Sequence, residues 1–318
     1  MQLAQSDDGR SWSLVTGWQS YNGSVPDVFR RGSKIYVMSV GGAPAYSTLE
    51  LTRLDLTTGV VSRSTVVVSD GVGFVDPSLE QLSDGRLIVY YLVTGGPGYN
   101  PATCRAGESS CVKEIKSAVE VAGSDGTRFI TDAGSRISET ITPMQPFSDP
   151  DIFYNGREWV LYVSRAQSVH AYTSGTPQGS FVFRGVVSDG QGGIPAGLTV
   201  SANETWTYVH LASSNGTVIK FGTSADGTTS VRSFTTVVDS AMFGLGAVAA
   251  SPGLALNVSG IECAACASAS GTQGGESAKA ASSVREGASC PRLGARAKSG
   301  KTRLICKKTG SKQLWARV

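Results

Sequence analysis

A short phrase that joins proline to aspartate recurs along this chain, and a strand-like run rich in aromatic residues follows each copy. The copies are Val25-Pro26-Asp27, Asp76-Pro77-Ser78 and Asp149-Pro150-Asp151. The runs that follow them lie at 35–37, 89–91 and 159–162. Repetition of this kind indicates an architecture built from similar units. An acid at the same place in each unit also means that these acids can meet in space.

The spacing of the copies predicts the kind of repeat. Pro26, Pro77, Pro150 and a further proline, Pro195, are separated by 51, 73 and 45 residues. The longest interval contains an insertion from 95 to 112 that a Cys104–Cys111 pair would close, and without it the period is close to 50. Short strands repeated every 40–50 residues or so are typical of β-propeller blades.

A second recurring signal is an Asp-Gly turn late in each unit. It occurs at Asp8-Gly9, Asp125-Gly126 and Asp226-Gly227, with a looser copy at 174–181. These turns resemble the Asp-box turns of sialidase-type propellers, in which the carboxylate caps local backbone N–H groups. Because a turn aspartate usually serves its own loop, we expect these residues to be structural.

The composition agrees with an all-β fold, because Gly makes up 39 of 318 residues, only 17% of residues are charged and no helical periodicity is long. Units that start near 25, 76, 149, 194 and 244 predict a five-bladed β-propeller over 1–261. The first 18 residues supply only the second half of a blade. We expect them to hydrogen-bond near 246–260 and to close the ring, which removes exposed sheet edges.

The end of the chain differs from the rest. Residues 262–287 are rich in Ala, Ser and Gly and predict a flexible linker. Residues 288–318 predict a small, disulfide-stapled basic module, which resembles short Cys-paired modules of secreted actinobacterial proteins. Residues 279–318 hold eleven of the 28 basic residues and one of the 25 acidic ones. This charge suits an anionic cell-wall polymer or an acidic glycan, and a solubilising tail is the alternative.

The number and spacing of the cysteines indicate whether the protein occupies an oxidising or a reducing compartment. By spacing they form three local pairs, Cys104/Cys111, Cys263/Cys266 and Cys290/Cys306. An even number with short loops favours disulfides in an oxidising environment over free thiols or a metal site. No apolar run is long enough to span a membrane. We therefore expect a secreted or cell-surface monomer that has no nucleic-acid partner and whose leader peptide is absent from this sequence.

The acids of the repeated phrase are the candidate site. The first strand of each propeller blade lines the central axis, so we expect Asp27, Asp76, Asp149 and Asp151 to converge at the channel mouth. Clustered carboxylates raise one another's pKa, which lets one act as an acid and another as a base, as glycoside hydrolysis requires. The alternative is that an aspartate beside proline only accepts backbone N–H groups and fixes the start of its strand.

Asp76-Pro77-Ser78 and the run from Asp149 to Gly156, with Trp159 and Tyr162 behind it, resemble five-bladed glycoside hydrolases of the arabinanase and β-xylosidase type, family 43-like. The resemblance covers roughly 20–245. It implies that one Asp-Pro aspartate is the base, that a second tunes the acid, and that the acid is the glutamate of a Glu-Gly-Pro phrase. Here Gly192-Gly193-Ile194-Pro195 stands in that place. The general acid is therefore unassigned, and Glu80, Glu139 and Asp189 remain as candidates.

The leading hypothesis is a glycoside hydrolase that acts on a poly- or oligosaccharide at the channel mouth. The alternative is a non-catalytic propeller that binds a glycan or a cell surface, which the missing Glu-Gly-Pro phrase supports. A sialidase-type hydrolase comes third, because no set of three arginines stands out for a sugar carboxylate. No cofactor is expected, and a structural Ca²⁺ in the central channel is left open.

Overall fold

The computed structural model describes residues 1–15, 18, 21–41, 48–69, 74–94, 102–213, 216–239, 252–253, 296–299, 302–309 and 312–317. These residues form strands and turns, as the composition predicts, and no helix among them could cross a membrane. Internal contacts divide the chain into two compact units, Met1–Gly271 and Thr272–Val318. We call them the propeller unit and the C-terminal unit.

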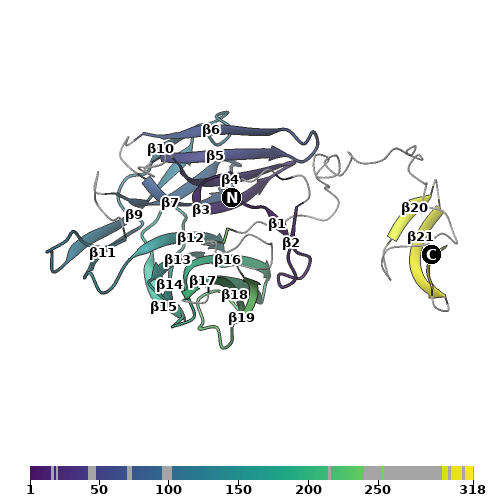
Figure 1. Ribbon diagram of the computed structural model, residues 1–318. Coiled ribbons are helices and arrows are strands. Elements are labelled where there is room, and N and C mark those ends of the chain that lie inside the picture. Colours follow the sequence, from purple (N-terminus) through teal and green to yellow (C-terminus); the bar gives the residue numbers. More distant parts are fainter. Residues whose placement is uncertain are drawn as a thin grey trace. The chain divides into compact units, whose positions relative to one another are not determined.

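Four blades of antiparallel strands make up most of the propeller unit (Figure 1). The first blade contains β3 (Ser24–Arg31), β4 (Lys34–Gly41), β5 (Thr48–Asp55) and β6 (Val61–Val68). The second contains β7 (Phe74–Gln81), β8 (Leu87–Val93), β9 (Cys111–Glu120) and β10 (Arg128–Thr131), with β11 (Ile137–Ile141) also paired to β9. The third contains β12 (Ser148–Tyr154), β13 (Trp159–Arg165), β14 (Ser168–Ser174) and β15 (Val182–Ser188). The fourth contains β16 (Gly193–Ser201), β17 (Glu204–Ser213), β18 (Gly216–Ser224) and β19 (Thr235–Asp239).

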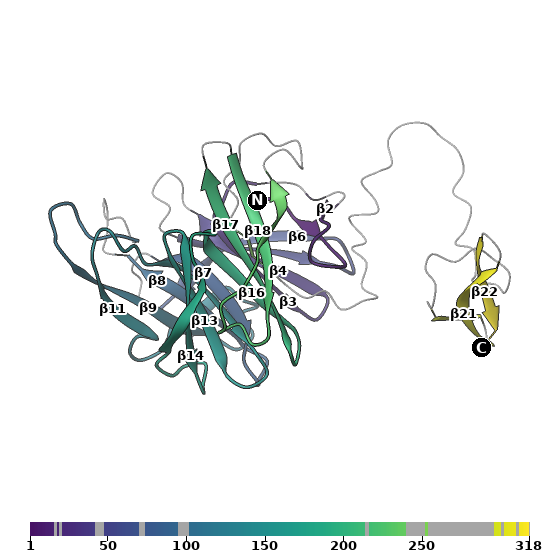
Figure 2. The same ribbon diagram turned by 90° about the horizontal axis from the view of Figure 1, so that it is seen from below.

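The first strands of the four blades lie next to one another in the middle of the propeller unit. Strand β3 contacts β7, β7 contacts β12, and β12 contacts β16. Figures 1 and 2 show the later strands of each blade lying progressively farther out. The repeated Pro phrase thus begins the innermost strand of each described blade, as the sequence predicts.

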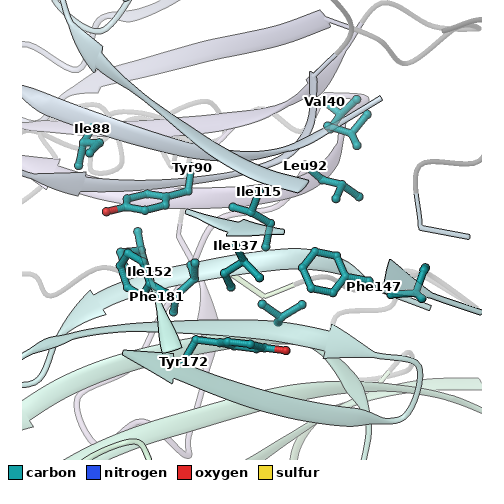
Figure 3. Close-up of a cluster of buried hydrophobic side chains, with 14 of the residues drawn as sticks. Val40, Ile88, Tyr90, Leu92, Ile115, Ile137, Phe147, Ile152, Tyr172 and Phe181 are labelled. Carbon is teal, nitrogen blue, oxygen red and sulfur yellow. The ribbon is translucent and has the colours of Figure 1, made fainter. Parts of the chain in front are cut away.

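Aromatic and branched side chains of the second strands fill the space between blades. Tyr90, Tyr91 and Tyr162 are fully buried, whereas Trp159 and Trp206 keep part of their surface exposed. Figure 3 shows Tyr90 and Ile152 in one such core, between the second and third blades. Successive side chains of a strand point to opposite faces, so a run such as Val89-Tyr90-Tyr91 packs against both neighbouring blades.

The second blade departs from the expected independent four-stranded unit. Its outermost strand, β10, also pairs in parallel with β6 of the first blade, so one continuous sheet joins the two blades. The expected disulfide of the insertion is present, because Cys104 is bonded to Cys111 at the start of β9.

The N-terminal residues lie between the fourth and first blades. Strands β1 (Ala4–Gln5) and β2 (Ser13–Leu14) pair with each other, and Gly9 between them lies against Trp206 of the fourth blade. Gly126 and Gly227 contact the preceding blade in the same way. Met1, Leu3 and Trp18 pack against buried residues of the first blade.

The predicted pairing of residues 1–18 with 246–260 falls almost wholly outside the described residues and stays a prediction. The exceptions are Pro252 and Gly253. A Cβ on Gly253 would lie 2.8 Å from the Cα of Asp27, which leaves room for glycine alone beside the first inner strand.

The late turns confirm the capping role for two of the three aspartates. Asp8 accepts hydrogen bonds from the N–H groups of Arg10 and Ser11, and Asp226 accepts them from Thr228 and Thr229.

The same prediction is wrong for Asp125. This residue binds across to the first blade, where Lys34 and Arg53 contact Oδ2 at 2.9 and 3.0 Å and Tyr36 donates to Oδ1 at 2.6 Å. Burial alone would raise the pKa of Asp125, but these contacts hold it well below its usual range. Asp125 therefore joins two blades.

Three strands of the C-terminal unit are described, β20 (Arg296–Ser299), β21 (Thr302–Thr309) and β22 (Lys312–Arg317), and they form one antiparallel sheet. The predicted Cys263/Cys266 and Cys290/Cys306 pairs involve residues outside the described ranges and stay predictions, as does the linker over 262–287.

Candidate functional site

The residue directly before each repeated proline has an unusual backbone conformation. We call these residues the mouth layer: Val25, Asp76, Asp149 and Ile194. Their φ angles are 45°, 55°, 48° and 47°, in the left-handed region that L side chains rarely adopt. Each marks a shift in the pairing between the first and second strands of its blade. Strain of this kind persists only where the surrounding fold imposes it, and it concentrates at functional sites.

The residue directly after each proline forms a second layer, deeper along the same strands. We call it the inner layer: Asp27, Ser78, Asp151 and Ala196. Each inner-layer side chain from Asp27 to Asp151 accepts a hydrogen bond from the backbone just after the equivalent position of the next blade, and Asp149 contacts Asp76 in the mouth layer, so the four inner strands begin at the same end of the unit. The sequence prediction that Asp76 and Asp149 share one register, and Asp27 and Asp151 another, is confirmed.

Two carboxylates meet in the mouth layer. The backbone N–H of Asp149 donates to Oδ2 of Asp76 at 3.3 Å, and the hydroxyl of Ser148 donates to Oδ2 of Asp149 at 2.6 Å. Asp76 is buried, while Asp149 keeps part of its surface exposed. The two acids therefore lie on adjacent inner strands, and Asp149 is the less buried of the two.

Both carboxyl groups hold protons more tightly than usual. Burial, together with the neighbouring charge of Asp149, raises the pKa of Asp76 well above its ordinary value. Burial raises the pKa of Asp149 to about 6, although the hydrogen bond from Ser148 opposes it. Such a pair titrates in two coupled steps, so between the two steps it carries one proton. It can then present an acid and a carboxylate at once.

The inner layer has a different chemistry, because its side chains are bound to backbone across the blade boundaries. Oδ2 of Asp27 accepts the N–H of Leu79 at 2.5 Å, and Oδ2 of Asp151 accepts the N–H of Gly197 at 2.6 Å. Between them, the hydroxyl of Ser78 accepts the N–H of Ile152 at 3.0 Å. This belt of hydrogen bonds links each described blade to the next.

The buried inner acids also hold protons tightly. Burial raises the pKa of Asp27 to about 7, and that of Glu80 to about 7 with a further contribution from the charge of Asp27. Burial and the charge of Asp27 raise the pKa of Asp151 well above its usual range. The geometry brings these acids together below the mouth, not beside Asp76 and Asp149.

The sequence leaves a structural Ca²⁺ in the central channel open, and these acids do not form a cluster with metal-ligand spacing in the described part of the chain. Both oxygens of Asp27 already accept hydrogen bonds. In the described part of the chain the one cluster with metal-ligand spacing is Cys104, Glu108 and Cys111, where both sulfur atoms belong to the disulfide.

The missing Glu-Gly-Pro glutamate has a structural explanation. When the prolines are superimposed, the glutamate would occupy position 193. A Cβ on Gly193 would lie 2.0 Å from the carbonyl oxygen of Ala166 and 2.5 Å from Oγ of Ser164. No side chain fits there without moving the turn between β13 and β14, so this chain cannot carry its acid at that position.

The other candidates for the acid lie in different surroundings. Glu139 accepts a hydrogen bond from Tyr172 and forms an ion pair with Arg165 at 3.1 Å. Asp189 is exposed and accepts the hydroxyl of Ser168 at 2.7 Å. Glu80 lies with the inner acids.

A cavity of about 160 Å³ is lined by residues that are close in sequence to Asp149 or to the strand paired with it. It is lined by Met144, Gln145, Pro146, Arg165, Ser168 and His170. Pro146 precedes Asp149 by three residues, and Arg165 follows Ser164, which pairs with Ser148. Sequence reasoning missed this cavity, because the segment before β12 and the β13–β14 turn meet only in the folded chain.

The propeller unit has the fold of propeller glycoside hydrolases. A thermostable family-43 glycoside hydrolase superimposes with a TM-score of 0.57, at 13% identity over 74% of this chain and 86% of that one. The Bacteroides ovatus protein described as xyloglucan PUL GH43B gives 0.50 at 12% identity, over 74% and 51% of the two chains. A fructofuranosidase from Schwanniomyces occidentalis, complexed with fructose, gives 0.51 at 14% identity, over 70% and 49%.

The chain spans about half the length of several of the structures that it resembles. No protein-family model matches the sequence, and no curated protein matches it. The likeness therefore concerns the fold, and the function has to be argued from the site.

Proposed function

We propose that the propeller unit is a secreted glycoside hydrolase that cleaves a poly- or oligosaccharide with Asp76 and Asp149. The observation that carries the proposal is the mouth layer. Two carboxylates with raised pKa values occupy strained, equivalent positions at the start of neighbouring inner strands. The likeness in fold to glycoside hydrolases supports the reaction class.

In this mechanism Asp76 is the acid and Asp149 the base. Asp76, whose pKa is raised well above its ordinary value, donates its proton to the glycosidic oxygen as the C–O bond breaks. Asp149 is ionised above about pH 6, and it accepts a proton from the attacking water or attacks the anomeric carbon itself. The pair thereby takes over the role of the glutamate that position 193 cannot hold. Asp27 and Asp151 position the inner strands that carry the pair.

The mechanism predicts how the rate depends on pH. Activity should rise as pH increases through about 6, because Asp149 must lose its proton, and it should fall again once the pH is high enough for Asp76 to ionise. The kcat/KM profile of the free enzyme measures both limbs. A profile that is flat between pH 4 and 8 or so would exclude this assignment.

The ring that holds the site is, in this proposal, a five-bladed propeller closed by its own N-terminus. Three contacts support the closure. The Gly9 turn lies against the fourth blade, Met1 and Leu3 pack on the first, and Gly253 lies beside Asp27. Pro252-Gly253 would then be the fifth copy of the repeated phrase. A crystal structure with an open gap between the fourth and first blades would exclude this arrangement.

A non-catalytic glycan-binding propeller is the second candidate, and one observation favours it. Val25 and Ile194 place apolar side chains at mouth positions equivalent to the acids. A screen of plant and microbial polysaccharides and aryl glycosides separates the two candidates. Release of reducing sugar that Asp149→Asn abolishes supports the enzyme. Saturable binding without hydrolysis, unchanged in Asp149→Asn, supports the binding protein.

A further inference from the structure

The cavity of about 160 Å³ lies at the same end of the third blade as the mouth layer. We call it the rim cavity, and its lining is Met144, Gln145, Pro146, Arg165, Ser168 and His170. Strand β12 begins at Ser148, β13 ends at Arg165, and Ser148 is paired with Ser164. The β13–β14 turn, which forms one wall of the cavity, therefore lies beside the start of β12, next to Asp149.

Packing links the wall of the rim cavity to the mouth pair. The guanidinium of Arg165 lies over the ring of Phe147, 5.4 Å from its centroid. Phe147 is fully buried in the core between the second and third blades (Figure 3). The next residue is Ser148, whose hydroxyl donates to Oδ2 of Asp149 at 2.6 Å. Phe147 and Ser148 therefore hold the cavity wall and Asp149 in a fixed relation.

The positive charge in the cavity wall is already neutralised. Arg165 forms an ion pair with Glu139 at 3.1 Å, and Glu139 also accepts a hydrogen bond from Tyr172. Asp189 accepts the hydroxyl of Ser168 at 2.7 Å and adds a negative charge beside the lining. No other lining residue among those described is a lysine or an arginine. The surroundings therefore disfavour a negatively charged ligand.

Two uncharged side chains of the lining have unused hydrogen-bonding groups. Burial, together with the positive charge of Arg165, lowers the pKa of His170, so its imidazole is neutral near pH 7 and offers one donor and one acceptor. The centroid of the Phe183 ring lies 5.3 Å from that of the imidazole, which fixes its orientation. Among the described residues, neither this imidazole nor the amide of Gln145 has a hydrogen-bond partner.

The chemistry of the lining matches one kind of ligand. Met144 and Pro146 supply apolar surface beside the imidazole and the amide. A sugar unit presents C–H groups on the face of its ring and hydroxyl groups at its edge, so it can use both. The volume equals the share of about five water molecules in the liquid, which is enough for a single sugar unit.

We propose that the rim cavity is a binding subsite for a neutral sugar unit of the glycan that Asp76 and Asp149 cleave. His170 and Gln145 hydrogen-bond its hydroxyl groups, and the Arg165–Glu139 ion pair leaves no free cation for a uronic acid. The inference rests on the proposed function, because that function makes the ligand a carbohydrate.

The test measures retention of the full chain, carrying Asp149→Asn to prevent cleavage, in affinity gels. The neutral polymers are arabinan, xylan, galactan and inulin, and the acidic one is polygalacturonate. His170→Phe keeps a ring against Phe183 and removes the hydrogen-bonding groups. Gln145→Ala has a matched control in Gln167→Ala, since Gln167 is an exposed residue of the β13–β14 turn that does not line the cavity.

We expect at least one neutral polymer to retain the protein more strongly than polygalacturonate does. His170→Phe and Gln145→Ala should each weaken that retention by about fivefold, the loss of one hydrogen bond. Gln167→Ala should change it by about twofold at most. Since Gln145 is exposed, Gln145→Ala carries the test alone if the melting curve of His170→Phe falls below that of the parent protein.

Three results would overturn the subsite: no retention by any neutral polymer, stronger retention by polygalacturonate, or retention that neither cavity variant weakens. The hydrolase would stand in each case if the protein with Asp149 intact cleaves a polymer and Asp149→Asn does not. Conversely, retention that depends on His170 and Gln145, in a protein with Asp149 intact that cleaves none of the polymers, would support the sugar site and contradict the hydrolase.

Discussion

The mouth layer and the inner layer lie two residues apart on the same strands, yet carboxylates in the two layers have different hydrogen-bond partners. In the inner layer, Asp27 and Asp151 bind backbone N–H groups of the next blade. In the mouth layer, Asp76 accepts one long hydrogen bond from backbone, and Asp149 accepts one from a serine. The supply of donors therefore decides whether a buried acid holds the fold or remains free for chemistry.

The comparison also separates two sources of unfavourable free energy, backbone strain and the burial of carboxyl groups. Mouth residues are strained in their backbone, whatever their side chain, because Val25 and Ile194 adopt the same left-handed φ as the two aspartates. The inner residues have ordinary backbone conformations. At Asp27 and Asp151 the unfavourable contribution is instead the burial of a carboxyl group. The fold imposes this backbone strain at the mouth position of each described blade. The sequence places an acid at that position in only two of the four blades.

The largest expected effect is on catalysis. Asp76→Asn and Asp149→Asn should each reduce kcat by about 10²–10⁴-fold, because each removes a proton donor or acceptor. Their unfolding free energies should stay within about 1 kcal/mol of wild type, since neither residue links blades through several bonds. Steady-state kinetics on the substrate found by screening, with urea unfolding alongside, measures both. Unchanged rates in both variants would end the catalytic assignment.

The matched change in the inner layer should act on stability. Asp27→Ala leaves the N–H of Leu79 and the hydroxyl of Ser78 without their acceptor. At pH 5, where Asp27 is protonated, we expect a loss of about 3 kcal/mol in urea unfolding. Asp27→Asn keeps an acceptor and should lose about 1 kcal/mol or less. An Asp27→Ala protein as stable as wild type would show that the belt of hydrogen bonds does not hold the blades.

The inner acids should also make stability depend on pH. The folded pKa values of Asp27 and Glu80 are about 7, well above the ordinary range near 4. Between these values the folded state binds more protons than the unfolded one, so stability should fall as pH rises from about 4 to 7. Asp27→Asn should flatten that slope. Stability that rises across this interval in wild type would contradict the raised pKa values.

The smallest expected effect comes from the strained backbone of the mouth layer. Val25→Gly relieves a left-handed conformation, which costs an L residue about 1–2 kcal/mol, but it also loosens the unfolded chain. We expect a net gain of at most about 1 kcal/mol in unfolding free energy and no change in kcat. Thermal unfolding of Val25→Gly beside Val28→Gly, an ordinary position of the same strand, checks this, since the second variant should only lose stability.

Sequence reasoning reached the repeat, the aromatic second strands and the two registers of acid, because these are local patterns that recur. It failed where a residue's role is set by another blade. Asp125 looks like its counterparts Asp8 and Asp226, but Gly123 stands where they have Ser6 and Ser224. The three cations that bind Asp125 are Arg31, Lys34 and Arg53 of the first blade, 72 to 94 positions away.

The dependence on contacts with distant segments also explains why the sequence alone leaves the general acid unassigned. The sequence shows that position 193 is glycine, but not that the turn at Ala166 leaves no space for a side chain there. It also contains Pro252-Gly253, where no acid stands beside the proline to mark the position as a copy of the phrase. Contacts between segments far apart in the chain decide both points.

Titration of the carboxyl carbons by ¹³C NMR tests most directly whether the mouth pair shares a proton. In wild type, Asp149 should titrate near pH 6, and the pKa of Asp76 should lie well above its ordinary value. In Asp149→Asn the pKa of Asp76 should fall, because a neighbouring charge is gone, and stay above its ordinary value, because burial remains. If both acids instead titrate independently near pH 4, they hold no shared proton and cannot divide the roles of acid and base.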